Sequence, residues 1–124
     1  MDISEAESIV MEVLWQRSPC TAEEVIVELA RDPTQDWQEP TVKTLLNRLL
    51  NKRAIRAEKD GRRYRYWPVL EREAWVSSQS RSLLDRLFQG RVAPLVAHFS
   101  EHGKLSKKDV EELKNLIEGL DDER

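Results

Sequence analysis

The sequence is poor in metal-binding and redox-active side chains. It has one cysteine, Cys20, and two histidines, His98 and His102, among 124 residues. A single cysteine cannot form an intrachain disulfide, which is typical of a reducing compartment. The two histidines are four residues apart and can share a helical face, but no cysteine or carboxylate set completes a metal shell. We therefore expect no metal site and no cofactor, and we interpret the histidines as solvated residues near a helix end.

Other absences exclude several classes of protein. The four glycines leave little room for an architecture rich in β hairpins. No apolar run approaches the roughly 18 residues of a membrane span, and the N-terminal residues MDISEAESIV lack the basic and then apolar pattern of a signal peptide. No nucleophile–base pair or phosphate-binding loop is visible. We expect a cytoplasmic protein without membrane insertion that is not an enzyme.

Positive charge is concentrated in one part of the chain. Residues 41–67 hold nine Lys or Arg residues against Glu58 and Asp60, a balance of +7, whereas the whole chain has a net charge of −3. The remainder therefore carries −10, and the sequence pI of 5.5 averages two unlike parts. A cationic segment in an acidic chain indicates a surface for nucleic acid, although an ordinary solvated basic face is the simpler alternative.

Three helices are predicted upstream of or within this basic segment. Ser4 with Glu7 and Thr21 with Glu24 are capping boxes that predict the starts of the first two helices. Pro40 marks the start of the third, whose apolar stripe consists of Val42, Leu45, Leu46, Leu49 and Leu50. Its other side is polar and basic, with Thr44, Asn47 and Arg48 opposite the stripe and Thr41 and Lys43 on the flanks.

A β hairpin is predicted directly after the third helix. The runs AIRAEK and RRYRYW flank the turn signal Asp60-Gly61. Alternation places Ile55, Ala57, Tyr64 and Tyr66 toward the helices and leaves cations at the tip and on the outer face. Three helices followed by a basic hairpin is the order of a winged helix-turn-helix, in which the third helix enters the major groove and the hairpin binds phosphate. The predicted fold is mainly α with a small antiparallel β hairpin, and this domain covers residues 1–70.

Residues 71–124 are predicted to form a helical region. A helix ends at Gly90, a short apolar segment VAPLVAHF follows, and Ser106 with Asp109 caps a last helix. This apolar surface is too small for an independent core, so we expect a homodimer. The predicted dimerisation residues are Leu83, Leu87, Phe88, Leu95, Phe99, Val110, Leu113, Leu116 and Ile117.

Several stretches carry a resemblance to a known family. ISEAESIVMEVLW, TVKTLLNRLLNKR, EKDGRRYRYWP, HFSEHGKLS and VEELKNLI resemble the penicillinase and methicillin-resistance repressors of the BlaI/MecI/CopY family. The resemblance implies a bacterial repressor that binds a double-stranded, two-fold related DNA operator as a homodimer. It also implies DNA contacts by Thr41, Lys43, Thr44 and Arg48 on the third helix and by Arg62 and Arg63 on the wing.

The sequence departs from the family pattern at three places. Glu39-Pro40 stands before Thr41 where relatives often have Pro and a basic residue. In β-lactam-responsive relatives a sensor-pathway protease acts beside an Asn-Phe pair, and the matching position here is His98-Phe99. The Cys-x-Cys pair of the copper-responsive branch is missing from the C-terminal residues LKNLIEGLDDER. Two alternatives stay open, namely a winged-helix protein-interaction module and a repressor that responds to another signal without proteolysis.

Overall fold

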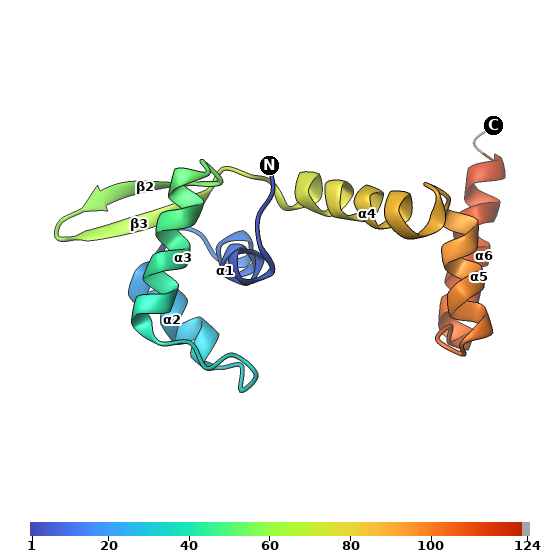
Figure 1. Cartoon of the computed structure of the whole chain (residues 1–124), viewed down its shortest axis with the longest axis horizontal. Coiled ribbons are helices and arrows are strands. Elements are labelled where there is room, and N and C mark those ends of the chain that lie inside the picture. Colours follow the sequence, from blue (N-terminus) through green and yellow to red (C-terminus); the bar gives the residue numbers. More distant parts are fainter. Residues whose placement is uncertain (123–124) are drawn as a thin grey trace. The chain divides into compact units, whose positions relative to one another are not determined.

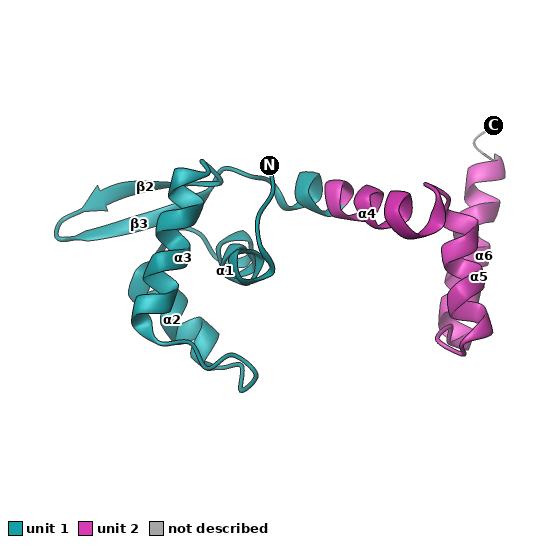
Figure 2. Ribbon diagram, in the orientation of Figure 1, with its two compact units in different colours: residues 1–76 teal, residues 77–124 magenta. Residues whose placement is uncertain are grey.

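The computed structural model describes residues 1–122 and contains two compact units, residues 1–76 and the residues from Ser77 onward (Figure 2). Figure 1 labels the elements in chain order. They are α1 (Glu5–Gln16), β1 (Cys20–Thr21), α2 (Ala22–Ala30), α3 (Glu39–Asn51), β2 (Ile55–Asp60), β3 (Arg63–Pro68), α4 (Arg72–Phe88), α5 (Val92–Glu101) and α6 (Lys107–Asp122). In the described part of the chain, none of the helices has the length and apolarity needed to span a lipid bilayer.

The predicted capping boxes begin α1 and α2. The backbone N–H of Glu7 donates to Oγ of Ser4 over 3.0 Å, and the Ser4 N–H donates to Oε1 of Glu7 over 2.7 Å. Thr21 and Glu24 make the same reciprocal pair at the start of α2. Each box satisfies two backbone donors that the first turn of a helix leaves unpaired. Ser106 and Asp109 repeat the arrangement before α6.

The core of the first unit lies between α1, α2, α3 and the small sheet. Val10, Met11 and Leu14 of α1 are fully buried, as are Val25 of α2 and Val42 and Leu49 of α3. These residues recur at helical spacing, so each helix buries one stripe and leaves the opposite side in water. Trp15 donates from Nε1 to the carbonyl of Leu70 and lies 5.5 Å from Trp75, which attaches the first turn of α4 to this unit.

The sheet has three strands in the order β1-β3-β2, all antiparallel. The hairpin closes with the pair Asp60–Arg63, so Gly61 and Arg62 form a two-residue turn. Gly61 has a φ of 66°, a conformation that glycine adopts without a steric penalty. The predicted winged helix is confirmed, and the structure adds β1, which pairs Cys20 with Tyr66 and Thr21 with Arg65.

An ion pair between a buried carboxylate and a partly exposed ammonium joins the start of α1 to the end of α3. Glu7 is 1% exposed, and its Oε1 accepts from Nζ of Lys52 over 2.7 Å. The same ammonium donates to the carbonyl of Asp2 over 3.0 Å. Burial alone would raise the pKa of Glu7, but hydrogen bonds from Lys52 and Ser4 outweigh it and the pKa lies below its usual value. Lys52 belongs to the basic segment, but its charge is used within the protein, in the ion pair with Glu7.

The second unit consists of the rest of α4 with α5 and α6. None of its residues 77–121 is buried, and its large apolar side chains are half-buried or exposed. Phe88 at the end of α4 lies 6.1 Å from the ring of His98 on α5. An apolar groove lies between α5 and α6, where Leu95, Phe99, Leu113 and Leu116 line it. The segment VAPLVAHF, predicted only as a short apolar run, is most of helix α5.

Replacing Lys52 by Met should lower the free energy of unfolding by roughly 1–3 kcal/mol, because the buried carboxylate of Glu7 loses its cation. Lys59→Met is the matched control, since Lys59 is exposed and has no ion pair with the described residues; this variant should stay within about 0.5 kcal/mol of the original. Chemical denaturation monitored by circular dichroism measures both. Equal stability of the two variants would contradict a structural role for Lys52.

Candidate nucleic-acid interface

Helix α3 presents the predicted polar face to solvent. Val42, Leu45, Leu46 and Leu49 are buried, whereas all five predicted contact residues of this helix, Thr41, Lys43, Thr44, Asn47 and Arg48, are exposed. The stripe of buried residues thus determines the orientation of the whole helix. Hydroxyl, amide and guanidinium groups in this arrangement are those that hydrogen-bond base edges in a major groove.

Thr41, Thr44 and Arg48 lie together around one shallow depression, with Pro40 and Leu45 as the other lining residues. The hydroxyl of Thr44 donates to the carbonyl of Pro40 over 2.9 Å. Its proton is thus directed into the helix, and the oxygen can still accept a hydrogen bond from outside. Arg48 has no ion pair with the described residues, so its guanidinium is available to an external acceptor.

Lys43 is held differently from Arg48. Its Nζ lies 2.8 Å from Oε1 of Glu39, one turn earlier on α3. The hydrogen bond and charge of Glu39 raise the pKa of Lys43, which keeps the ammonium charged. Glu39 also places a negative charge at the start of the helix, where it suits the helix dipole but would repel a nearby phosphate.

The cations of the basic segment divide into two groups. Lys43, Lys52, Arg56 and Arg65 each have an acidic partner. The other five have no ion pair with the residues that the structure describes: Arg48, Arg53, Lys59, Arg62 and Arg63. Sequence alone could not separate the groups, because the partners of Lys52 and one partner of Arg65 lie far away in the chain.

On the hairpin, Arg62 occupies the turn and Arg63 begins β3, and both are exposed. Arg63 also lines a depression with residues of α2, among them Glu23 and Val27. Of the tyrosines expected to pack against the helices, Tyr66 does contact the core. The expectation for Tyr64 is wrong, since its side chain is 51% exposed. Tyr64 pairs with Lys59 directly before the turn-closing pair, and the tip of the hairpin extends beyond the helices (Figure 1).

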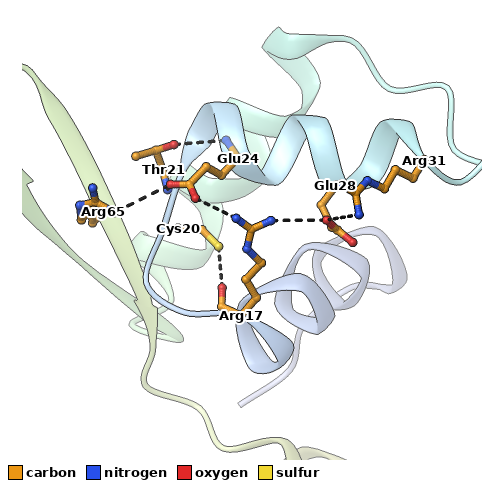
Figure 3. A network of polar contacts seen from close by, with 7 residues as sticks. All are labelled: Arg17, Cys20, Thr21, Glu24, Glu28, Arg31 and Arg65. Carbon is orange, nitrogen blue, oxygen red and sulfur yellow. Dashed lines mark hydrogen bonds and ion pairs between the residues drawn. The ribbon is translucent and has the colours of Figure 1, made fainter.

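A polar network connects strand β3 of the hairpin to α2 (Figure 3). Glu24 is its centre, with Nη2 of Arg17 at 3.2 Å from Oε2 and Nη1 of Arg65 at 3.8 Å from Oε1. Arg65 also contacts Asp60 through Nε at 2.7 Å. The pKa of Glu24 lies below its usual value. The main cause is the hydrogen bond from the backbone N–H of Thr21, and the charges of Arg17 and Arg65 add to it.

Cys20 lies beside this network and is fully buried. Its thiol donates to the carbonyl of Arg17, and burial raises the pKa of the thiol. A buried thiol with a raised pKa is a poor nucleophile, which indicates that Cys20 is a packing residue.

The second unit contains the predicted cleavage and dimerisation residues. His98 and Phe99 lie in the last turns of α5 and are exposed. Six of the nine predicted dimerisation residues are exposed, at 37–66%: Leu83, Leu87, Phe99, Val110, Leu116 and Ile117. Phe88, Leu95 and Leu113 are half-buried.

A polar helix face beside an exposed basic hairpin defines a winged helix-turn-helix protein of the transcription-regulator class. The family model described as penicillinase repressor matches residues 3–119, and the chain belongs to this family. Its members are transcriptional repressors and not enzymes.

Individual relatives support the same family. The penicillinase repressor of Bacillus licheniformis is 35% identical over 116 residues, covering 94% of this chain and 89% of that protein. The methicillin resistance regulatory protein MecI of Staphylococcus aureus (strain N315) is 30% identical, and the match covers 94% of this chain and 93% of MecI. The solution structure of the monomeric form of Bacillus licheniformis BlaI in complex with the blaP half-operator is similar with a TM-score of 0.51. The two sequences are 38% identical, and the match covers 59% of this chain and 87% of the BlaI chain.

Replacing Glu24 by Gln should change how stability depends on pH. The lowered pKa of Glu24 in the folded state means that its charge stabilises the fold fully above its unfolded-state pKa, and that this contribution is lost as pH falls through the folded pKa. At neutral pH, E24Q should be less stable by up to about 1 kcal/mol, since the ion pairs are partly exposed. The difference should vanish in acid. Urea unfolding from pH 7 to pH 3 measures it, with Glu23→Gln, the neighbour outside the capping box, as the control.

Proposed function

We propose that this protein is a transcriptional repressor that binds a two-fold symmetric DNA operator as a homodimer. The observation that carries the proposal is the exposed set Thr41, Thr44 and Arg48 on α3, next to a hairpin with unpaired cations. The helix face would read base edges, while the hairpin would bind phosphates. The monomer of the Bacillus licheniformis relative binds a half-operator, and we infer one half-site for each protomer of this chain.

The roles of the helix residues differ by chemistry. Arg48, which has no ion pair with the residues that the structure describes, suits a bidentate contact with a guanine. Thr41 and Thr44 would accept or donate single hydrogen bonds, and Asn47 is exposed on the same helix. Lys43 would have to share its charge between Glu39 and a phosphate, so its contribution should be smaller than that of an unpaired lysine. Arg62 and Arg63 would bind phosphate from the hairpin.

Dimerisation follows from the exposure of the second unit. A unit in which residues 77–121 include no buried side chain has no core of its own, and units of this length rarely fold without an additional surface. Leu116 and Ile117 on α6 are 66% and 58% exposed, and Leu87 on α4 is 63% exposed. A second copy of the same surface would cover these side chains and place two winged helices on one operator.

Release by proteolysis at His98-Phe99 is the part of the proposal that rests on the family pattern. The peptide bond lies inside α5, where the carbonyl of His98 accepts from the N–H of His102 over 3.2 Å, so a protease would have to unwind the end of this helix. Cleavage would separate α6 from the rest of the chain and remove apolar surface from the dimer. The alternative is a repressor that responds to another signal with its chain intact. Mass spectrometry of the protein from derepressed cells distinguishes them, because an uncleaved chain excludes proteolysis.

Replacing Arg48 by Ala should weaken binding to the preferred duplex by roughly 1–3 kcal/mol and relax discrimination at one base pair. Fluorescence anisotropy with duplexes that differ at single positions measures this. Arg86→Ala, which removes an exposed arginine from α4, is the control with the same change in charge and should keep the original selectivity. A loss that is uniform over all sequences would assign Arg48 to phosphate. Equally weak binding of the original protein to every duplex would favour a protein-interaction module.

Replacing both Leu116 and Ile117 by Glu should raise the dissociation constant of the dimer at least roughly 100-fold, because burial of one such side chain contributes about 1.5–3 kcal/mol. Both side chains are already largely exposed in the single chain, so the variant should still fold. Lys114→Glu makes the same change in net charge at an exposed polar position of α6 and should remain dimeric. Sedimentation equilibrium measures both, and an unchanged dimer in the double variant would contradict the assigned surface.

A further inference from the structure

The pairing register sorts the side chains of the hairpin onto two faces. Residues directly opposite in antiparallel strands project to the same side. One face carries the successive pairs Ile55–Pro68, Ala57–Tyr66 and Lys59–Tyr64. Ile55 is buried and Tyr66 packs against the core, so this is the inner face. The outer face carries the pairs Arg56–Trp67, Glu58–Arg65 and Asp60–Arg63.

Both acids of the basic segment lie on the outer face, where they engage its arginines. Arg56 pairs with Glu58, and its guanidinium also lies 4.3 Å above the ring of Trp67. Arg65 contacts Asp60 at 2.7 Å and reaches Glu24 on α2. A cation that is already paired has less charge to offer a phosphate, and it would have to give up these contacts first. Arg56 and Arg65 therefore serve mainly to hold the hairpin, whereas Arg63 on the same face has no ion pair with the described residues.

Near the tip of the hairpin, the side chains of the inner face are exposed and are not engaged in ion pairs with the described residues. Burial falls along it from Ile55 through Tyr66, which is half-buried, to Tyr64, which is 51% exposed. Lys59 is directly opposite Tyr64, is exposed and has no ion pair with the described residues. At the tip, this face thus presents one free ammonium beside one free aromatic ring with a hydroxyl group.

Charges on α2 and α3 act on the inner face. Burial raises the pKa of Tyr66, and the charge of Lys43 on α3 opposes part of this rise. Tyr64 also acts on Tyr66, as expected for neighbours on one face. The negative charge of Glu23 on α2 raises the pKa of both Lys43 and Tyr66. By the pairing register, Tyr66, Tyr64 and Lys59 lie on one face that leads to the hairpin tip.

We propose that the hairpin also meets the DNA backbone with its inner face, through Lys59 and Tyr64, and that the two paired arginines of its outer face, Arg56 and Arg65, are structural. Lys59 binds a phosphate as a point charge, and the Tyr64 hydroxyl donates to a phosphate or sugar oxygen while its ring packs on the sugar. This inference rests on the proposed function, and it adds two residues to the interface while keeping Arg56 and Arg65 outside it.

The test compares salt dependence in full-length variants. The probe is a duplex that the original protein selects from a randomised pool, and binding is measured by anisotropy over a series of salt concentrations. Lys59→Ala should lower the slope of log K against log salt by about one unit, because one fewer counterion is released. Tyr64→Phe should weaken binding about 3- to 10-fold, the value of one hydrogen bond, with the slope unchanged. Arg56→Ala, one strand position before Ala57 and on the opposite face, should keep the original slope.

The outcomes separate this inference from the proposed function. A normal slope for K59A together with a lowered slope for R56A would show that the outer face meets the duplex and would overturn the inference. Original slopes and affinities for K59A and Y64F would overturn it as well, while selective binding by the unmodified protein would leave the proposed function standing. Failure of the unmodified protein to select any duplex would overturn both. Because Lys59, Tyr64 and Arg56 are exposed, the variants should fold, which thermal unfolding checks.

Discussion

The first unit depends on one constraint: helix α3 is buried along its apolar side and exposed along its polar side. The core and the neighbouring helices hold it in this orientation. Val42, Leu46 and Leu49 have at most 1% of their surface exposed, so rotation of the helix about its axis would move apolar side chains into water at a cost of about 1.5–3 kcal/mol each. The ion pair between Lys52 and the buried Glu7 fixes the C-terminal end of the helix against α1. The orientation of the reading face is therefore set by the core beneath it.

Charge is used in two ways within one short segment. Some cations hold the structure together, as Lys52 does for α3 and Arg65 for the base of the hairpin. Others, such as Arg48 and Lys59, are exposed and have no ion pair with the described residues. The division matters because an ion pair within the protein competes with a phosphate for the same cation. A count of basic residues consequently overstates the charge that this surface can offer to DNA.

The two units differ in how they obtain stability. The first has a closed core with fully buried residues from three helices, whereas the described residues of the second leave their apolar side chains half-buried or exposed. If the second unit is completed by another copy, as proposed, then its stability and the affinity for a two-fold operator depend on the same buried surface. A signal that disturbs that surface would weaken DNA binding without touching the winged helix.

Local patterns in the sequence determined the helix starts, the apolar stripes and the hairpin. The Ser4, Thr21 and Ser106 caps, the stripe of α3 and the Asp60-Gly61 turn all depend on residues a few positions apart, and the polar face of α3 follows directly from its stripe. Tertiary structure alone decided the third strand β1, the burial of Glu7 against Lys52, the exposure of Tyr64 and the division of the cations into paired and free. Each of these depends on where segments far apart in the chain come together, or on where the helices stop covering the hairpin, and periodicity within one segment carries no information about either.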